Sequence, residues 1–239
     1  MIVNGFAFAI AGFAAASPQG EVLFETSAVS QISGIEVETP VTVYGVETPG
    51  GDDALTLTAV ADLEMALPAA LRALEHDINR RSVECGLRLS GRNAGASVSD
   101  GGVRISITVG AEQWACFGGM KSRLASDRGT IRARLAPEVD YGRLQLRLVE
   151  FRVDGMSDLS RSIGLEALMR GFLKMEIDKF NDDPELTTLP EPLQREGFEL
   201  TDVRFTDEDG APSLRADVVG PNDVYAVTRV FREMTKAEL

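Results

Sequence analysis

The sequence predicts an α+β fold: a long, curved antiparallel β-sheet wrapped around a long amphipathic helix, with additional shorter helices. Segments between residues 41 and 153 alternate apolar and polar side chains, which is the period of a half-buried strand. Residues 157–181 switch to apolar spacings of three and four, which is the period of a helix. A strand of about 12 residues is about 40 Å long and a helix of about 24 residues about 36 Å long, so we expect the helix to match the sheet in length.

The first regular elements are two strands and a helix. Residues 41–46 and 55–63 alternate as strands. Residues 68–81 form a helix, because apolar side chains such as Leu74 and Ile78 recur at spacings of three and four. Each of these elements has one apolar face, so each is expected to cover part of a core.

The central segment predicts an antiparallel meander with one face on a core and the other in solvent. Residues 86–99 are expected to turn at Gly91–Gly95, and the segments 101–117 and 129–142 alternate regularly. In the next strand, residues 142–153, the apolar set shifts by one position at Val149. Such a shift indicates a β-bulge, which bends a long strand.

The helix over residues 157–181 has a wide apolar face and two glycines, Gly164 and Gly171, that would allow a close approach. Ser157 or Asp158 is expected to cap its N-terminus. Two more strands and an amphipathic helix from about Asn222 follow.

Charge is unevenly distributed along the 239-residue chain, whose net charge is −13. Residues 80–152 hold 13 Lys and Arg against 7 Asp and Glu, whereas both flanks are acidic. This net charge speaks against a general nucleic-acid binder, which needs cationic groups to displace counterions from phosphate. The basic segment is either neutralised by the flanks or forms a cationic sheet face for an anionic membrane surface. The side chains of that face are Arg104, Arg132, Arg134 and Arg147.

The first twenty residues carry no charge, and Ile2–Ala16 is almost wholly apolar. Ala14-Ala15-Ala16 fits a cleavage pattern, so residues 1–16 are interpreted as a signal peptide cleaved near Ala16, with export to the periplasm. The usual basic residue at the start is missing. The alternatives are a short membrane anchor and a buried N-terminal strand.

The chain has two cysteines, Cys85 and Cys116, at a spacing that fits no zinc or redox motif. In an exported chain the pair predicts a disulfide. In a reducing compartment the same residues would be two buried thiols.

No catalytic or metal-binding pattern stands out. The single histidine, His76, lies on a charged helix face, and the acidic clusters at 181–185 and 207–210 lack the spacing of a calcium loop. We therefore expect a protein that is not an enzyme and has no cofactor and no metal.

The order of elements over residues 55–219 resembles that of bacterial members of the tubular lipid-binding (TULIP) superfamily, especially its periplasmic branches of unknown function. The resemblance rests on "RGTIRARLAPEVDYGRLQLRLVEFRVDGM", the apolar helix after it, and "LTTLPEPLQREGFELTDVRF". In that superfamily a helix packs inside a curled antiparallel sheet, and the space between them holds acyl chains. The resemblance implies one domain over residues 17–239 without catalytic residues. It also implies a hydrophobic interior lined by Val103, Ile105, Ile107, Leu144, Leu146, Leu148, Ile163, Met169, Phe172 and Met175.

Two functions fit these observations. One is non-catalytic binding or transport of a lipid or another hydrophobic small molecule in the bacterial cell envelope. The other is an envelope scaffold or assembly factor with a solid core, which contacts a membrane or a protein through the basic sheet face.

Overall fold

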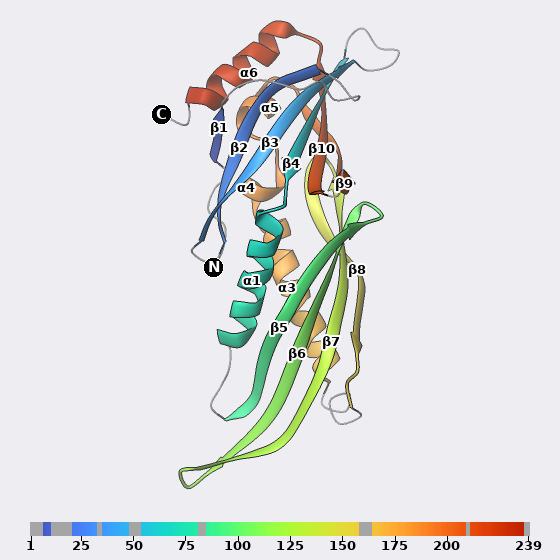
Figure 1. Cartoon of the computed structure of the whole chain (residues 1–239). Helices are drawn as coiled ribbons and strands as arrows, with labels where there is room; N and C mark the ends of the chain where they lie inside the picture. Colours follow the sequence, from blue (N-terminus) through green and yellow to red (C-terminus); the bar gives the residue numbers. More distant parts are fainter. Residues whose placement is uncertain are drawn as a thin grey trace.

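The chain folds into two antiparallel sheets with helices beside them (Figure 1). The computed structural model describes residues 7–10, 21–32, 35–47, 54–80, 85–157, 164–208 and 211–236. The six-stranded sheet has the order β1 (Ala7–Ile10), β2 (Glu21–Ile32), β3 (Ile35–Glu47), β4 (Ala54–Asp62), β10 (Ala211–Pro221), β9 (Glu199–Glu208). The four-stranded sheet has the order β5 (Gly86–Ser99), β6 (Gly102–Phe117), β7 (Met120–Asp140), β8 (Arg143–Asp154). The helices are α1 (Ala66–Arg80), α3 (Leu165–Asp182), α4 (Pro184–Thr187), α5 (Glu191–Arg195) and α6 (Val224–Lys236).

This architecture corrects the prediction of an α+β fold with one sheet wrapped around one long helix. The fold is mainly antiparallel β, and its strands form two sheets. The helix expected over residues 157–181 is α3, which has only 18 residues. It lies along one face of the four-stranded sheet and is not enclosed, because Leu168 and Met175 are 52% and 42% exposed.

α3 begins later than expected, and one of its expected caps binds elsewhere. Ser157, one of the expected caps, is instead bound to β7: its backbone N–H and its hydroxyl both donate to Asp127 Oδ2, at 2.9 and 2.8 Å. Asp158 lies outside the described residues. The helix begins after Gly164, whose φ of 71° is left-handed and suits glycine.

The two sheets meet where β9 passes the turn between β5 and β6. The backbone N–H of Phe205 donates to the carbonyl of Gly101 at 3.1 Å. Phe205 also packs against a cluster formed by Val103, Leu135 and Ile177, which come from the four-stranded sheet and α3. The six-stranded sheet has its own core with α5 and α6, in which Phe198 and Val230 are buried.

Alternation along β6 and β7 gives the four-stranded sheet its two faces, as predicted. Val103, Ile107 and Val109 are buried on the inner face, which α1 and α3 cover (Figure 1). Arg104 and Arg132 are exposed on the outer face. Burial of apolar area on the inner face is the main stabilising contribution here.

The β-bulge predicted in the strand over residues 142–153 is confirmed. Arg134 pairs with Glu150 and Leu135 with Leu148, so Val149 has no partner in the register. The prediction of a turn at Gly91–Gly95 is wrong, because β5 runs through this segment with an irregularity in its register on β6.

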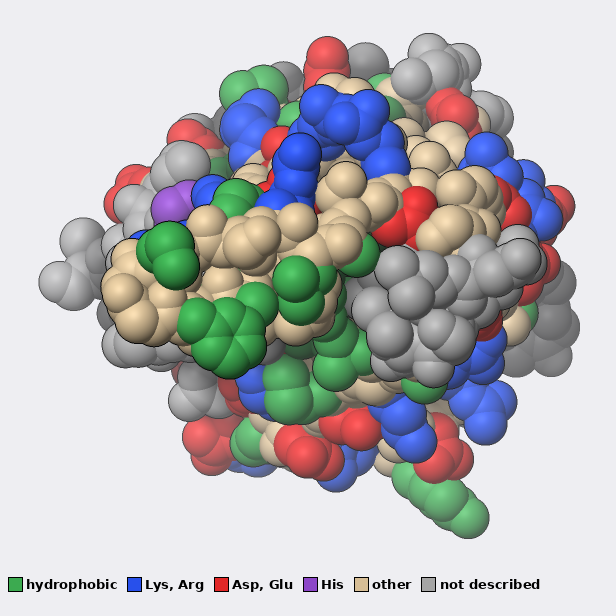
Figure 2. Space-filling view, turned by 90° about the horizontal axis from the view of Figure 1, so that it is seen from below, with side chains coloured by type: hydrophobic (Ala, Val, Ile, Leu, Met, Phe, Trp, Pro, Cys, Tyr) green, Lys and Arg blue, Asp and Glu red, His purple; other side chains and the backbone are tan. Residues whose placement is uncertain are grey.

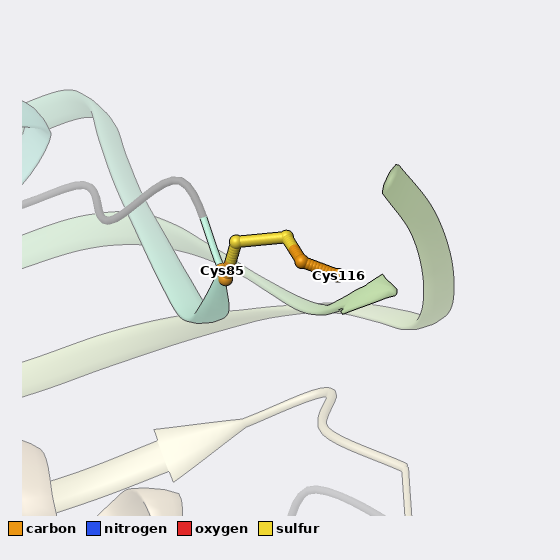
Figure 3. The surroundings of a disulfide bond; sticks show 2 residues. All are labelled: Cys85 and Cys116. Carbon is orange, nitrogen blue, oxygen red and sulfur yellow. A yellow bond between two sulfur atoms is a disulfide. The ribbon is translucent and has the colours of Figure 1, made fainter. Parts of the chain in front are cut away.

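The predicted disulfide is present (Figure 3). It joins Cys85, just before β5, to Cys116 near the end of β6, with the two Cα atoms 5.9 Å apart. The bridge therefore ties two neighbouring strands together near the turn between β6 and β7.

The helix predicted over residues 68–81 is confirmed as α1, and the C-terminal helix as α6. The signal peptide expected over residues 1–16 falls largely outside the described residues. Its described part, Ala7–Ile10, is β1, which pairs antiparallel with β2. Across the described ranges, none of the helices has both the length and the hydropathy needed to cross a membrane.

Candidate functional site

An apolar groove runs between α1, α3 and β5, on the inner side of the four-stranded sheet. Its volume is about 470 Å³. The lining residues are Ile78 from α1, Leu89 from β5, and Ala167, Leu168, Met169, Gly171, Phe172 and Met175 from α3. None of these side chains has a titratable group, so the groove offers no acid, base or nucleophile to a ligand.

Spacing along α3 explains how one helix supplies most of the lining. Leu168, Gly171, Phe172 and Met175 lie at intervals of three and four, so they share one side of the helix. Met169 lies deeper and is buried against the inner face of the sheet. The helix therefore packs with one side and presents an adjacent apolar side to the groove.

Gly171 keeps the groove open. A Cβ atom built at this position would have no atom within 4 Å apart from its chain neighbours and the backbone of its own helix. Glycine in a helix interior costs about 0.5–1 kcal/mol relative to alanine, so packing and helix propensity both favour a larger residue here. The position adds empty space beside Leu168 and Met175.

Two asparagines hold the helices that border the groove. Asn79 of α1 donates to the carbonyl of Gly91 on β5 and accepts from its N–H, both at 3.0 Å. Asn181 of α3 donates to the carbonyl of Leu146 on β8 at 3.0 Å and accepts from its N–H at 2.8 Å. Since β5 and β8 are the two edge strands of this sheet, each helix is fixed to one edge.

The N-terminal half of α3 has a further anchor. The Arg170 guanidinium lies 5.2 Å from the centre of the Phe151 ring and donates to the Phe151 carbonyl at 3.2 Å. A cation over an aromatic face is an attractive contact. It fixes α3 beside β8 and leaves the groove on the side toward α1.

The apolar residues that the resemblance implied as lining are divided between the groove and solid packing. Met169, Phe172 and Met175 line the groove. Ile107 is buried with Met169, and Leu144 packs against the core of the six-stranded sheet. The cluster around Ile177 contains Val103, Ile105, Leu146 and Leu148. Ile163 lies outside the described residues.

Sequence reasoning missed the contributions of Ile78 and Leu89, since nothing local indicates that α1 and β5 meet α3. Leu168 and Gly171 could have been found, because both fall on the helical spacing that leads to Met175.

A second hollow, of about 500 Å³, lies on the outer face of the four-stranded sheet and is lined mainly by polar residues. Three of the predicted basic residues, Arg104, Arg132 and Arg134, come together there with Arg152, which sequence reasoning missed. Arg104 pairs with Arg134 across β6 and β7, and Arg132 with Arg152 across β7 and β8. Arg147 lies apart and pairs with Glu138 at 2.7 Å.

Aspartates at the rim offset part of this positive charge. Asp100 lies 3.3 Å from Arg104 and 3.9 Å from Arg134. Asp154 binds Arg132 and lies 3.7 Å from Arg152. The Nε atom of Arg134 is buried without a hydrogen-bond partner among the described residues. The hollow therefore keeps a modest positive character.

Within the described ranges, no three His, Cys, Asp or Glu side chains gather in a way that could hold a metal ion. His76 is exposed on α1.

Comparison with known proteins assigns no family to this chain. No protein-family model and no curated protein sequence matches the chain. Among solved structures, the chain is similar to one described as "Crystal structure of lipopolysaccharide binding protein", with 13% sequence identity and a TM-score of 0.36. The match covers 87% of this chain and 45% of that chain, so this chain spans less than half of its length. A likeness of this size carries no argument about function.

Proposed function

We propose that the protein binds a lipid or another hydrophobic molecule, without catalysis, by taking an acyl chain into the groove between α1, α3 and β5. The observation that carries this proposal is the lining: every residue of a groove of about 470 Å³ is apolar, yet Leu168 and Met175 remain 52% and 42% exposed. Covering such a surface with hydrocarbon gains about 25 cal/mol per Å² removed from water.

The groove has the size and character of a ligand site. Small-molecule sites commonly enclose about 300–1,000 Å³ and are lined mainly by apolar side chains. Met169 and Met175 have flexible side chains that adapt to chains of different shape. Because the lining has no charged group, the polar end of the ligand stays at the open side of the groove.

The proposed location is the bacterial cell envelope, after export. The disulfide between Cys85 and Cys116 supports this location, because disulfides persist in oxidising compartments such as the periplasm. Cleavage near Ala16 is part of the same proposal, and N-terminal sequencing of the mature protein tests it.

The binding proposal is tested with a fluorescent fatty acid and with native mass spectrometry of the gently purified protein. We expect saturable binding and a co-purified lipid. Gly171→Leu places a side chain in the open space of the groove and is expected to weaken binding by about tenfold or more. Lys179→Leu adds a similar side chain in the last turn of α3, outside the groove lining, and serves as the control. Equal affinity of the wild type and Gly171→Leu contradicts the proposal.

A second candidate function is contact with an anionic surface through the outer face of the four-stranded sheet. The hollow that brings together Arg104, Arg132, Arg134 and Arg152 favours it. In that case, Arg104→Gln combined with Arg134→Gln abolishes binding to anionic vesicles, whereas Gly171→Leu leaves it unchanged.

A further inference from the structure

The strands β6 and β7 continue beyond their neighbours as a two-stranded ribbon (Figure 1). The first residue of β5, Gly86, pairs with Trp114, and the register of β8 on β7 ends at Thr130. β6 therefore has no register with β5 past Trp114, and β7 has none with β8 before Thr130. From there to their turn, β6 and β7 pair with each other. Gly118 and Gly119 form this turn with φ values of 53° and 83°. Two central residues with positive φ give the tight hairpin connection that suits strand twist.

Large apolar side chains are exposed on this ribbon. Phe117 and Met120, which flank the turn, are each 75% exposed, and Leu124 is 65% exposed. Seen from the end of the molecule that carries the turn, hydrophobic side chains gather at the surface (Figure 2). A group of exposed apolar residues on a projecting element is typical of a surface that meets a partner or a membrane.

Phe117 and Met120 face the same way as the groove. Phe117 and Met120 are directly paired, so their side chains share one face of the ribbon. Counting back along β6 in steps of two leads from Phe117 to Ala111 and Val109, which are buried on the inner face beneath the helices. The ribbon therefore extends the inner face of the sheet past the ends of α1 and α3.

Basic side chains lie at this end of the molecule. Residues 114–124 include Lys121 and Arg123 and no Asp or Glu, in a protein with a net charge of −13, and Arg123 is paired with Glu112 just outside this segment. Such a protein is repelled by an anionic surface over most of its area and attracted where basic groups project. Basic side chains near an anionic bilayer each contribute about 1 kcal/mol of attraction.

The ribbon is also fixed in place. Cys116, next to Phe117, is bonded to Cys85 at the start of β5. Arg123 donates to Glu112 at 3.0 Å, and the indole N–H of Trp114 donates to the other oxygen of the same carboxylate at 3.0 Å. A surface that is already ordered loses less conformational entropy on binding.

We propose that the β6–β7 tip inserts Phe117 and Met120 into the interfacial region of an anionic lipid bilayer, with Lys121 and Arg123 at the level of the headgroups. Aromatic and other large apolar side chains beside basic residues are the composition expected of an element that lies in this interface. Docking by the tip does not require a ligand in the groove, so it is independent of the proposed function.

Trp114 is the only tryptophan of the chain and pairs with Arg123, so its fluorescence reports on the headgroup-level part of the ribbon next to the tip. We expect a blue shift and sedimentation with vesicles of phosphatidylglycerol and phosphatidylcholine, and much weaker binding to phosphatidylcholine alone. Phe117→Ser combined with Met120→Ser is expected to weaken vesicle binding by about tenfold or more. Met65→Ser removes another exposed methionine, 67% exposed and just before α1, and is the matched control.

Three results overturn the proposal. The first is equal vesicle binding by the wild type and the Phe117→Ser/Met120→Ser variant. The second is loss of binding only in Arg104→Gln/Arg134→Gln, which assigns the contact to the outer sheet face. The third is a dimer that the tip variant dissociates, with no vesicle binding by the wild type; the tip is then an interface between two copies.

Discussion

Asn79 exchanges two hydrogen bonds with the backbone of Gly91, and this exchange fixes the C-terminal end of α1 to the edge of the four-stranded sheet. The side-chain amide uses one N–H group as a donor and its carbonyl oxygen as an acceptor. A residue of a neighbouring strand would present its backbone N–H and C=O in the same arrangement. It therefore occupies a position on the edge of β5 that would otherwise be open to another chain.

Replacing Asn79 with alanine is expected to lower the free energy of unfolding by about 1–2 kcal/mol, because two hydrogen bonds at a partly buried site are lost. Urea unfolding measures the change. Arg80→Ala, at the next and exposed position, is the control and is expected to stay within about 0.5 kcal/mol of the wild type. If both variants unfold at the same urea concentration, the Asn79 side chain does not hold α1.

Reduction of the disulfide is expected to lower stability by about 3–4 kcal/mol in the chain-entropy model, since Cys85 and Cys116 are 31 residues apart. Thermal unfolding with and without reductant measures the effect. The double variant Cys85→Ser/Cys116→Ser is the control, because it should unfold like the reduced protein and ignore the reductant. An unchanged melting temperature on reduction contradicts this expectation.

Gly171→Ala is expected to raise the free energy of unfolding by about 0.5–1 kcal/mol, because alanine favours the helix and the added Cβ meets no atom within 4 Å apart from its chain neighbours and the backbone of its own helix. Denaturant unfolding measures the gain. Ala167→Gly, one turn earlier on α3, is the reverse control and is expected to lose a similar amount. A loss of stability in Gly171→Ala means that the position is more crowded than its geometry indicates.

The pKa of Glu112 lies below its ordinary value of about 4.5, because the carboxylate accepts hydrogen bonds from Trp114 and Arg123. A lowered pKa means that these bonds stabilise the ribbon above the ordinary value and are lost as pH falls through the folded-state value. Acid titration followed by Trp114 fluorescence should therefore show a midpoint below about 4.5. Arg123→Gln is expected to raise this midpoint. If Arg123→Gln leaves the midpoint unchanged, Arg123 is not a cause of the lowered pKa of Glu112.

The β-bulge in β8 could be predicted because it leaves a local trace. Leu146 and Leu148 belong to one apolar phase and Phe151 and Val153 to the other, and only one inserted residue, Val149, keeps both sets on the inner face. The regular strands of the meander could be predicted for the same reason, since side-chain period is a local property.

Strand partners could not be read in this way. β4 pairs with β10, which is about 150 to 170 residues away in the chain, and the alternation of β4 fits any antiparallel neighbour. The division into two sheets depends on such distant pairings, so the prediction of a single sheet was wrong. The start of α3 was predicted wrongly because Ser157, which follows β8, binds Asp127 on β7, and the local sequence does not show this contact.

The groove could be predicted only in part. Spacing on α3 indicates that Leu168 and Met175 share a side, but which side of the helix stays uncovered depends on where Ile78 and Leu89 pack. That position results from the tertiary contacts of α1 with β5, for which the local sequence has no pattern.

The paired arginines on the outer face of the four-stranded sheet have a consequence for the behaviour of the protein at high concentration. Arg104 faces Arg134, and Arg132 faces Arg152, while Glu150 lies opposite Arg134, so this face is densely charged. Long, regular strands favour lamination into cross-β stacks when their faces are apolar. Two copies meeting through this face would have to bury these charged side chains, and the cost of removing them from water opposes fibril growth from the native state.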